Sequence, residues 1–372
     1  MPQNEKSIFI CAGDPSGDIA GSHLISQISL KKPQLKFFGL GGRLMKKAGQ
    51  NQLIDGDRLA VLGFWEVAKK YFFFRRLMND TIEAIRRKKP AAIILIDYPG
   101  FNLRLAKRIK RLGIPVIYYI SPQIWAWGAG RIDEIKKYVD SMLLILPFEK
   151  DIYNQAGVKN IFIGHYLLDD IDTEFIKAPF NPESKLITLL PGSRPQEVER
   201  MLPVLVKSTP LIAKTGDYKF AVGAVAGDID YKAYIGNSPV PIDIVGGRTR
   251  ELIAESRLVI TSSGTATLET GIIGRPMIVI YKTGWITYHI ARRLVRLDKI
   301  ALINIAAGEK IVPELIQKDA SPENIAGAAE KFLTSDEYSQ STVRKLNLVT
   351  DTLGTPGAAE RAADAIMEII NC

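Results

Sequence analysis

The sequence predicts an α/β protein built from two doubly wound domains, each a parallel sheet with helices on both faces. Short apolar runs rich in β-branched residues alternate with amphipathic, charged stretches along the whole chain. A polar, proline-containing segment at 169–184 interrupts this alternation once, and 372 residues are enough for two cores. Ligands of such sheets bind beyond the carboxyl ends of the strands, so we expect an active site in a central cleft that both domains face.

We divide the chain into an N-terminal domain (1–170), a C-terminal domain (171–345) and a helical segment (346–372) that we expect to pack back on the N-terminal domain. The first domain shows helical patterns at 18–30, 43–49 and 101–113, and strand patterns at "SIFICAG", "KFFGLGG", "AAIILID", "PVIYYIS", "SMLLILPF" and "NIFIG". The second shows helical patterns at 195–214 and 321–334, and strand patterns at "LITLLPGS", "YKFAVGAV", "IDIVGG", "RLVITSS" and "PMIVIYK". The C-terminal segment shows a helical pattern at about 357–370.

Charge differs between the two halves of the chain. Residues 1–170 contain 26 Lys and Arg against 16 Asp and Glu, whereas the remainder contains 23 against 24. A basic half favours a negatively charged partner, although solubility alone explains it equally well. The polar N-terminus and the absence of an apolar run of about 20 residues predict a cytoplasmic protein. Two cysteines and three scattered histidines indicate neither a disulfide framework nor a zinc site.

The first strand leads into "AGDPSGDIAGSHL", which has the outline of a phosphate-binding turn. Its spacing differs from G-x-G-x-x-G, no G-K-[ST] follows, and the second strand ends without the acid that would bind a ribose. Ser16 and Asp18 are good N-cap residues for the next helix. A loop formed by Ser16, Gly17 and Asp18 that faces a phosphate or sugar is the alternative.

Asp97 ends the apolar run "AAIIL" and precedes a Pro-Gly turn. A carboxylate at the tip of a parallel strand lies where ligands bind, and desolvation there can tune its pKa for general-base catalysis. The alternative is that Asp97 caps the helix at 101–112.

The strongest local pattern is "ITSSGTATLE". Ser263, Gly264 and Thr265 place hydroxyl groups and a glycine at a helix start, which is typical of a phosphate site without a Walker lysine. Glu269 lies about one turn further on, where a carboxylate can accept both ribose hydroxyls of a nucleotide. The alternative is a capped helix with a solvated Glu269.

Two weaker patterns accompany it. Arg194 in "LLPGSRPQ" lies at a helix start, where a guanidinium and free N–H groups can bind a diphosphate. Asn304 lies in an apolar setting before a glycine turn, where its amide can pair with a uracil edge or with the core itself.

Two basic, aromatic stretches at 65–78 and 285–297 are unlike ordinary core helices. In a helix, the four consecutive rings at 71–74 cannot all face one core, so at least one ring should be exposed among basic residues. Such elements fit a membrane surface, although core packing or a dimer contact would also explain them.

Taken together, the motifs "GDPSGD", "GLGG", "IDYPGFN", "YYISPQIWAW", "LPFE", "LLPGSR", "SGTATLE" and "NIAAG" run through nearly the whole chain. In this order and spacing the chain resembles the lipid-A-disaccharide synthase family, bacterial inverting glycosyltransferases of glycosyltransferase family 19. The resemblance implies two Rossmann-like domains of the GT-B type.

The resemblance also implies the reaction. The donor would be UDP-2,3-diacylglucosamine, the acceptor 2,3-diacylglucosamine 1-phosphate, and the products a β-1,6-linked disaccharide 1-phosphate and UDP, with no metal or other cofactor and no nucleic acid. Asp97 matches the family's essential aspartate, a base for the acceptor 6-hydroxyl. The UDP-side positions match at Arg194, Ser263, Gly264, Thr265, Glu269 and Asn304.

The family resemblance further implies that the N-terminal domain takes the lipid acceptor and attaches peripherally to the anionic inner membrane through 65–78 and 285–297. It leaves open whether the chain forms a homodimer. We interpret the opening loop as a wall facing the lipid sugar, with Asp18 a cap rather than a catalyst.

This sequence departs from the family pattern at Asp14, where Glu is usual, at Gly100, where an acid is usual, and at Tyr166, where proline is usual. We expect the tyrosine to loosen the segment between the domains. The alternatives are a related UDP-sugar enzyme, namely an epimerase or a peptidoglycan-precursor transferase, and a non-catalytic lipid- or nucleic-acid-binding protein.

Overall fold

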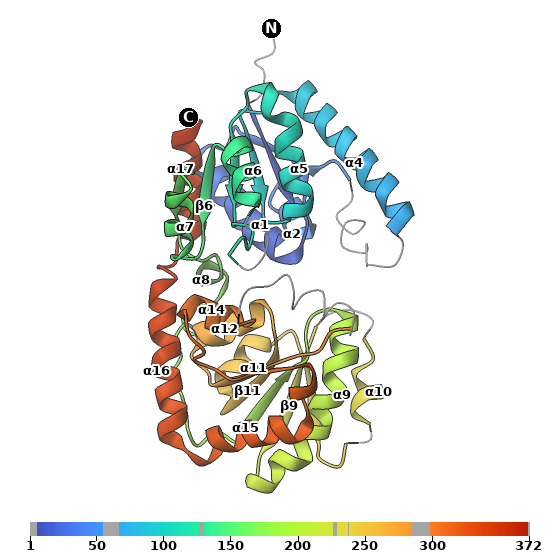
Figure 1. Ribbon diagram of the computed structural model, residues 1–372, viewed down its shortest axis with the longest axis vertical. Helices are drawn as coiled ribbons and strands as arrows, with labels where there is room; N and C mark the ends of the chain where they lie inside the picture. Colours follow the sequence, from blue (N-terminus) through green and yellow to red (C-terminus); the bar gives the residue numbers. More distant parts are fainter. Residues whose placement is uncertain are drawn as a thin grey trace. The chain divides into compact units, whose positions relative to one another are not determined.

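The computed structural model describes residues 6–54, 67–125, 130–225, 229–236, 238–284 and 298–370, with the backbone alone described at 67–71. The chain divides into two compact units (Figure 1). The first comprises Met1–Asp170 with Leu353–Cys372, and the second Ile171–Thr352. The chain thus returns to the first unit at Leu353, and the boundary expected at 345 was wrong because it falls inside helix α16 (Asp336–Thr352).

The first unit is a seven-stranded parallel sheet in the order β3-β2-β1-β4-β5-β6-β7. Its strands are β1 (Ser7–Ala12), β2 (Lys36–Leu40), β3 (Gln50–Gln52), β4 (Ala92–Ile96), β5 (Val116–Tyr119), β6 (Ser141–Leu144) and β7 (Asn160–Phe162). Its helices are α1 (Pro15–Lys31), α2 (Arg43–Lys47), α4 (Val67–Lys88), α5 (Pro99–Ile109), α6 (Arg131–Tyr138), α7 (Glu149–Gln155), α8 (Leu167–Asp170) and α17 (Ala358–Ile369), with a 3-10 turn at Lys110–Leu112.

The second unit is a six-stranded parallel sheet in the order β10-β9-β8-β11-β12-β13. Its strands are β8 (Leu186–Leu190), β9 (Lys219–Ala224), β10 (Ile242–Gly246), β11 (Leu258–Ser262), β12 (Met277–Tyr281) and β13 (Glu314–Ile316). Its helices are α9 (Pro195–Ile212), α10 (Tyr231–Ile235), α11 (Thr249–Glu255), α12 (Thr265–Ile273), α14 (Leu302–Ala307), α15 (Pro322–Thr334) and α16, with 3-10 turns at Ala213–Thr215 and Gln317–Asp319.

The central strands of both sheets consist mostly of apolar residues, as is typical of strands that helices cover on both faces. Every residue of β4, β5 and β11 is buried. The last helix, α17, returns to the first unit, where it packs against α1, and Lys31 contacts Asp364 at 2.7 Å. The expected α/β class with two doubly wound sheets is confirmed.

The start of α1 differs from the expectation. Asp14, not Ser16 or Asp18, is its N-cap, because the Asp14 carboxylate accepts a hydrogen bond from the Gly17 N–H at 2.8 Å. Asp18 lies inside the first turn, and its buried carboxylate is directed to the neighbouring helix α2. It accepts hydrogen bonds from the backbone N–H groups of Gly42, Leu44 and Met45 at 2.9–3.0 Å.

No side chain of α2 itself caps that helix, so Asp18 supplies the cap from another element. Within the described part of the chain, no helix is both long and apolar enough to cross a membrane.

Replacing Asp18 by alanine tests whether helix α2 depends on this cap for its stability. We expect the first unit to lose about 2 kcal/mol of stability, because the backbone N–H groups of Gly42, Leu44 and Met45 lose their acceptor. Urea denaturation measures the loss, and faster amide exchange at Leu44 and Met45 locates it. Alanine at the exposed Asp133 of α6 is the matched control and should cost less than about 0.5 kcal/mol. Unchanged exchange in α2 would show that Asp18 is not its cap.

Candidate active site

In the first unit, the strand order reverses between β1 and β4, which are neighbours in the sheet. Ala12 at the end of β1 pairs with Ile96 at the end of β4. The turns that follow these strands therefore lie side by side at the carboxyl edge of the sheet, where doubly wound sheets bind ligands. These turns contain Asp14 and Asp97.

Asp97 lies in a strained turn that buried side chains stabilise. Asp97 and Tyr98 have φ angles of 42° and 46°, in the left-handed region that is costly for residues other than glycine. The Asp97 carbonyl accepts hydrogen bonds from Asn102 Nδ2 at 2.7 Å and from Tyr118 Oη at 2.5 Å. Asn102 and Tyr118 are both fully buried. Sequence reasoning used Asn102 only as part of a family motif and missed its role in shaping this turn.

The environment of Asp97 suits a general base. Burial, and to a smaller extent the neighbouring Asp14 carboxylate, raise the pKa of its carboxyl to about 7, while a backbone hydrogen bond at Tyr98 acts in the opposite direction. A carboxyl that titrates near neutral pH can accept a proton and is still ionised in a large fraction of the enzyme molecules. The alternative role as a helix cap is not observed, because Tyr98 holds the N-cap position of α5 and no side chain caps it.

The opening loop mainly stabilises the fold around this turn. The Asp18 side chain acts as a cap, as expected, but it caps α2 and not α1. The Gly17 N–H is bonded to Asp14, and a Cβ at Gly17 would lie 2.7 Å from the Asp14 carboxylate.

Tyr166 replaces the family's usual proline without loosening its own surroundings. Its ring is buried and stacks on His165 with a centroid distance of 4.7 Å. Burial raises the pKa of the Tyr166 hydroxyl to about 12 and lowers that of the His165 imidazole to about 3. Both side chains are therefore neutral core groups of the first unit.

Two further family motifs meet at a buried acid that the sequence did not single out. Glu149 of "LPFE" accepts hydrogen bonds from Trp125 Nε1 at 3.2 Å and from the Leu146 N–H at 3.3 Å. Burial raises the pKa of its carboxyl to about 7. Glu149 thus ties the turn after β5 to the turn after β6 at the carboxyl edge.

In the second unit, the strand order reverses between β8 and β11, where Leu190 pairs with Thr261. The turns after these strands carry two of the predicted nucleotide segments. Arg194 lies at the start of α9 with its side chain 75% exposed, 3.6 Å from the Glu197 carboxylate. Glu197 also accepts hydrogen bonds from the N–H groups of Ser193 and Arg194. An anion at this helix start therefore competes with Glu197 for those donors.

The start of α12 is more open. Gly264 is exposed and holds the N-cap position, with no atom within 4 Å of where a Cβ would stand. The first N–H groups of a helix lack partners within the helix, so an anion can approach the backbone from Gly264 onward. The neighbouring hydroxyl groups are already oriented, because Ser263 donates to the Ile300 carbonyl at 2.9 Å and Thr267 to the Gly264 carbonyl at 2.8 Å. Thr265, the first residue of the helix, is half-buried.

Glu269 lies one turn further along α12 and is not a solvated surface residue. Its Oε1 atom contacts Arg250 Nε of α11 at 2.8 Å. Arg250 was not among the expected site residues, because its helix carries no recognisable ligand motif.

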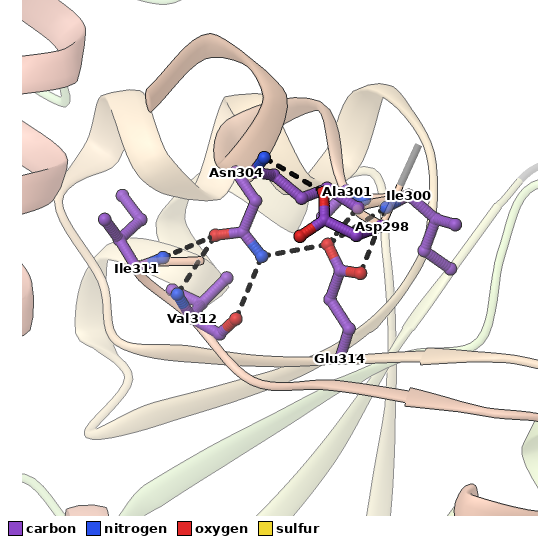
Figure 2. Close-up of polar contacts among 8 residues, drawn as sticks. Asp298, Ile300, Ala301, Asn304, Ile311, Val312 and Glu314 are labelled. Atoms are coloured by element: carbon purple, nitrogen blue, oxygen red, sulfur yellow. Dashed lines mark hydrogen bonds and ion pairs between the residues drawn. The ribbon is translucent and has the colours of Figure 1, made fainter. Parts of the chain in front are cut away.

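Asn304 is where the structure contradicts the expected nucleotide contact. Figure 2 shows its amide enclosed by the chain between α14 and β13. Nδ2 donates to the Val312 carbonyl at 2.9 Å and to Glu314 Oε1 at 2.8 Å, and Oδ1 accepts from the N–H groups of Ile311 and Val312. Asn304 is fully buried and has used both donors and both acceptor positions, so it orders this loop and leaves no group for a uracil.

The same network reaches the phosphate segment. Glu314 accepts hydrogen bonds from the backbone N–H groups of Ile300 and Ala301 (Figure 2). Ser263 donates to the Ile300 carbonyl. Asn304 is thus linked to the predicted nucleotide site through Glu314 and Ile300.

The predicted membrane elements are described in part. The segment 285–297 and residues 65 and 66 lie outside the described residues. In α4, the Phe72 ring is 68% exposed next to the exposed Arg75 and Arg76, whereas Phe73 and Phe74 pack on the core. The expectation that at least one ring is exposed is confirmed.

The fold is shared with proteins of different activity. A calicheamicin glycosyltransferase aligns with a TM-score of 0.63 at 15% identity, covering 99% of both chains. A UDP-GlcNAc 2-epimerase from Neisseria meningitidis, solved with UDP-GlcNAc, aligns with a TM-score of 0.62 at 14% identity, covering 97% of this chain and 99% of its own. At these identities the likeness shows the fold alone, and the fold does not distinguish a transferase from an epimerase.

Sequence comparison makes that distinction. The family model described as lipid-A-disaccharide synthetase matches residues 8–368. A lipid-A-disaccharide synthase from Syntrophus aciditrophicus is 39% identical over 99% of this chain and 98% of its own length. The matched region contains the Asp97 turn, the open start of α12 and both places where the strand order reverses. The chain therefore belongs to the lipid-A-disaccharide synthase family.

Proposed function

We propose that this protein transfers 2,3-diacylglucosamine from UDP-2,3-diacylglucosamine to the 6-hydroxyl of 2,3-diacylglucosamine 1-phosphate. The products are the β-1,6-linked disaccharide 1-phosphate and UDP. Family membership over nearly the whole chain supports the reaction. The observation that carries the chemistry is the Asp97 carboxyl, whose pKa is raised to about 7 in a turn at the carboxyl edge of the sheet.

The proposed reaction is a single displacement. The acceptor oxygen attacks the anomeric carbon of the donor sugar, and Asp97 takes the proton from that hydroxyl as the new C–O bond forms. The bond between the anomeric carbon and the diphosphate oxygen breaks, and UDP leaves with that electron pair. Attack from the opposite side converts the α-linked donor into a β-linked product.

The second unit is proposed to bind the donor through groups at the carboxyl edge of its sheet. The start of α12 at 263–265 and the exposed Arg194 provide positive potential for the diphosphate, which gains charge as it leaves. Glu269 accepts hydrogen bonds from the ribose. Within the described residues no cluster of His, Cys, Asp and Glu is arranged to bind a metal ion. Metal-independent transfer is part of this proposal.

Replacing Asp97 by asparagine tests the reaction and the base together. We expect wild-type enzyme incubated with both lipid substrates to form the disaccharide, detected by mass spectrometry. We expect the variant to lose about 10²-fold or more of kcat, because asparagine cannot accept the proton. Calorimetric titration with UDP should give the same affinity for both proteins, since Asp97 lies in the other unit. A variant rate close to that of the wild type would exclude Asp97 as the base.

Replacing Asp14 by asparagine should move the pH dependence of kcat/KM. The base must be ionised, so activity falls as the pH drops through the pKa of Asp97. Removing the negative charge of Asp14 lowers that pKa, so the acid limb should shift to lower pH by about 0.5 to 1 unit. Burial, the larger cause, remains and keeps the limb well above the ordinary range of an aspartate.

Asparagine retains the N-cap of α1, so the shift should not come from unfolding. Glutamate at position 14 keeps the charge and should leave the limb in place. An acid limb that does not move in the asparagine variant would show that Asp14 does not tune the titrating group.

We also propose that the protein attaches peripherally to anionic membrane surfaces through α4, where Phe72 is exposed beside Arg75 and Arg76. Flotation with vesicles rich in anionic lipid should recover the protein at low salt, and recovery should fall as salt screens the arginines. Replacing Arg75 and Arg76 by glutamine should reduce recovery several-fold, whereas glutamine at Arg200, an exposed residue of α9, serves as the control. Equal recovery of both variants would argue against α4 as the contact.

A further inference from the structure

The ion pair between Arg250 and Glu269 links two helices that both start at the carboxyl edge of the second sheet. Arg250 is the second residue of α11, which follows β10, and Glu269 is the fifth residue of α12, which follows β11. Their side chains are 27% and 19% exposed, and Arg250 Nε lies 2.8 Å from Glu269 Oε1. The pair is thus partly shielded from water but still open to a ligand.

The chemistry of the pair leaves capacity for a ligand. A carboxylate offers about four acceptor positions on its two oxygens, and the hydrogen bond from Nε occupies one position on Oε1. The planar guanidinium fixes the direction of the carboxylate, which reduces the conformational entropy that Glu269 loses when a ligand binds. Two adjacent hydroxyl groups of a ribose match the remaining acceptor positions.

Other buried arginines of the same unit serve the fold instead. Arg257 donates to the Phe332 carbonyl and pairs with Asp336, and Arg275 donates to carbonyl groups that include Ala254. Arg250 differs because one of its partners is the acid of the predicted nucleotide segment.

We propose that Arg250 is a positioning residue that orients Glu269 toward the ribose hydroxyls of the UDP donor. This inference rests on the proposed function, in which Glu269 contacts the ribose. Arg250 acts through Glu269 and is not itself a ligand of the nucleotide.

The test compares UDP with 2′-deoxy-UDP by calorimetric titration. Wild-type protein should bind UDP about tenfold more tightly than the deoxynucleotide, because the lost hydroxyl leaves a carboxylate acceptor unused. Arg250→Gln should weaken UDP binding about tenfold and bring the two affinities within about twofold of each other. Arg250→Lys, which keeps the charge but not the planar fork, should recover part of the preference.

Arg248→Gln is the matched control. Arg248 lies two residues earlier, is 66% exposed and pairs with Glu251 at 3.8 Å, so its loss should change UDP affinity less than twofold. Glu269→Gln should weaken UDP binding at least as much as Arg250→Gln. The double variant should be no weaker than Glu269→Gln alone, because both changes remove the same contact.

Three outcomes would overturn the inference. One is wild-type affinity and preference in Arg250→Gln. Another is equal weakening of UDP and 2′-deoxy-UDP, which would indicate a direct phosphate contact. The third is additive losses in the double variant. Should Arg250→Gln fail to fold in thermal melts, the preference measured with Arg250→Lys decides in its place, and an undiminished preference would overturn the inference.

Failure of the proposed function gives a different pattern. Absence of UDP binding by the wild-type protein, or an unchanged preference in Glu269→Gln, would reject the proposed donor site itself. Weakening in Glu269→Gln without weakening in Arg250→Gln would reject only the role of Arg250.

Discussion

The parallel direction of every strand is the constraint on which the candidate site depends. Because all strands of a sheet run the same way, the turns that follow them gather at one edge, and the reversal of strand order leaves two of them adjacent. In the first unit this places Asp14 beside Asp97, and in the second it places the turn before Arg194 next to the turn that leads into α12. None of these pairs is close in sequence, so the chemistry exists only once the sheets have formed.

The Asp97 turn is energetically costly because of its backbone angles and its buried carboxyl, and the surrounding core stabilises it. Two consecutive residues have left-handed backbone angles, and a carboxyl is withdrawn from water next to another carboxylate. Hydrogen bonds from Asn102 and Tyr118 to the Asp97 carbonyl stabilise the backbone. Gly13 contributes by leaving room for Tyr98, because a Cβ there would lie 2.3 Å from the ring. The turn is therefore set by residues that never need to touch a substrate.

Hydrophobic periodicity predicts the elements whose buried faces are apolar and fails where polar residues pack inside. The apolar runs locate most strands of both sheets, but α16 is missed because Ser339, Thr342 and Thr350 lie on its buried face. Position in a motif identifies Asp97 and the start of α12. It cannot show that Asn304 is saturated by its own loop, or that Asp18 caps α2, since those partners lie 7 to 27 residues away.

Two acidic side chains of the candidate site show how their neighbours decide their roles. Asp97 lies in a buried turn beside the acid Asp14, which disfavours its ionised form and suits it to accept a proton near neutral pH. Glu269 lies beside the guanidinium of Arg250, whose hydrogen bond fixes the direction of the carboxylate and suits it to bind hydroxyl groups. A carboxylate alone specifies neither role. Because each neighbour comes from a different strand-to-helix turn, the division between proton transfer and ligand binding is encoded in the topology of the sheets as much as in the two acids themselves.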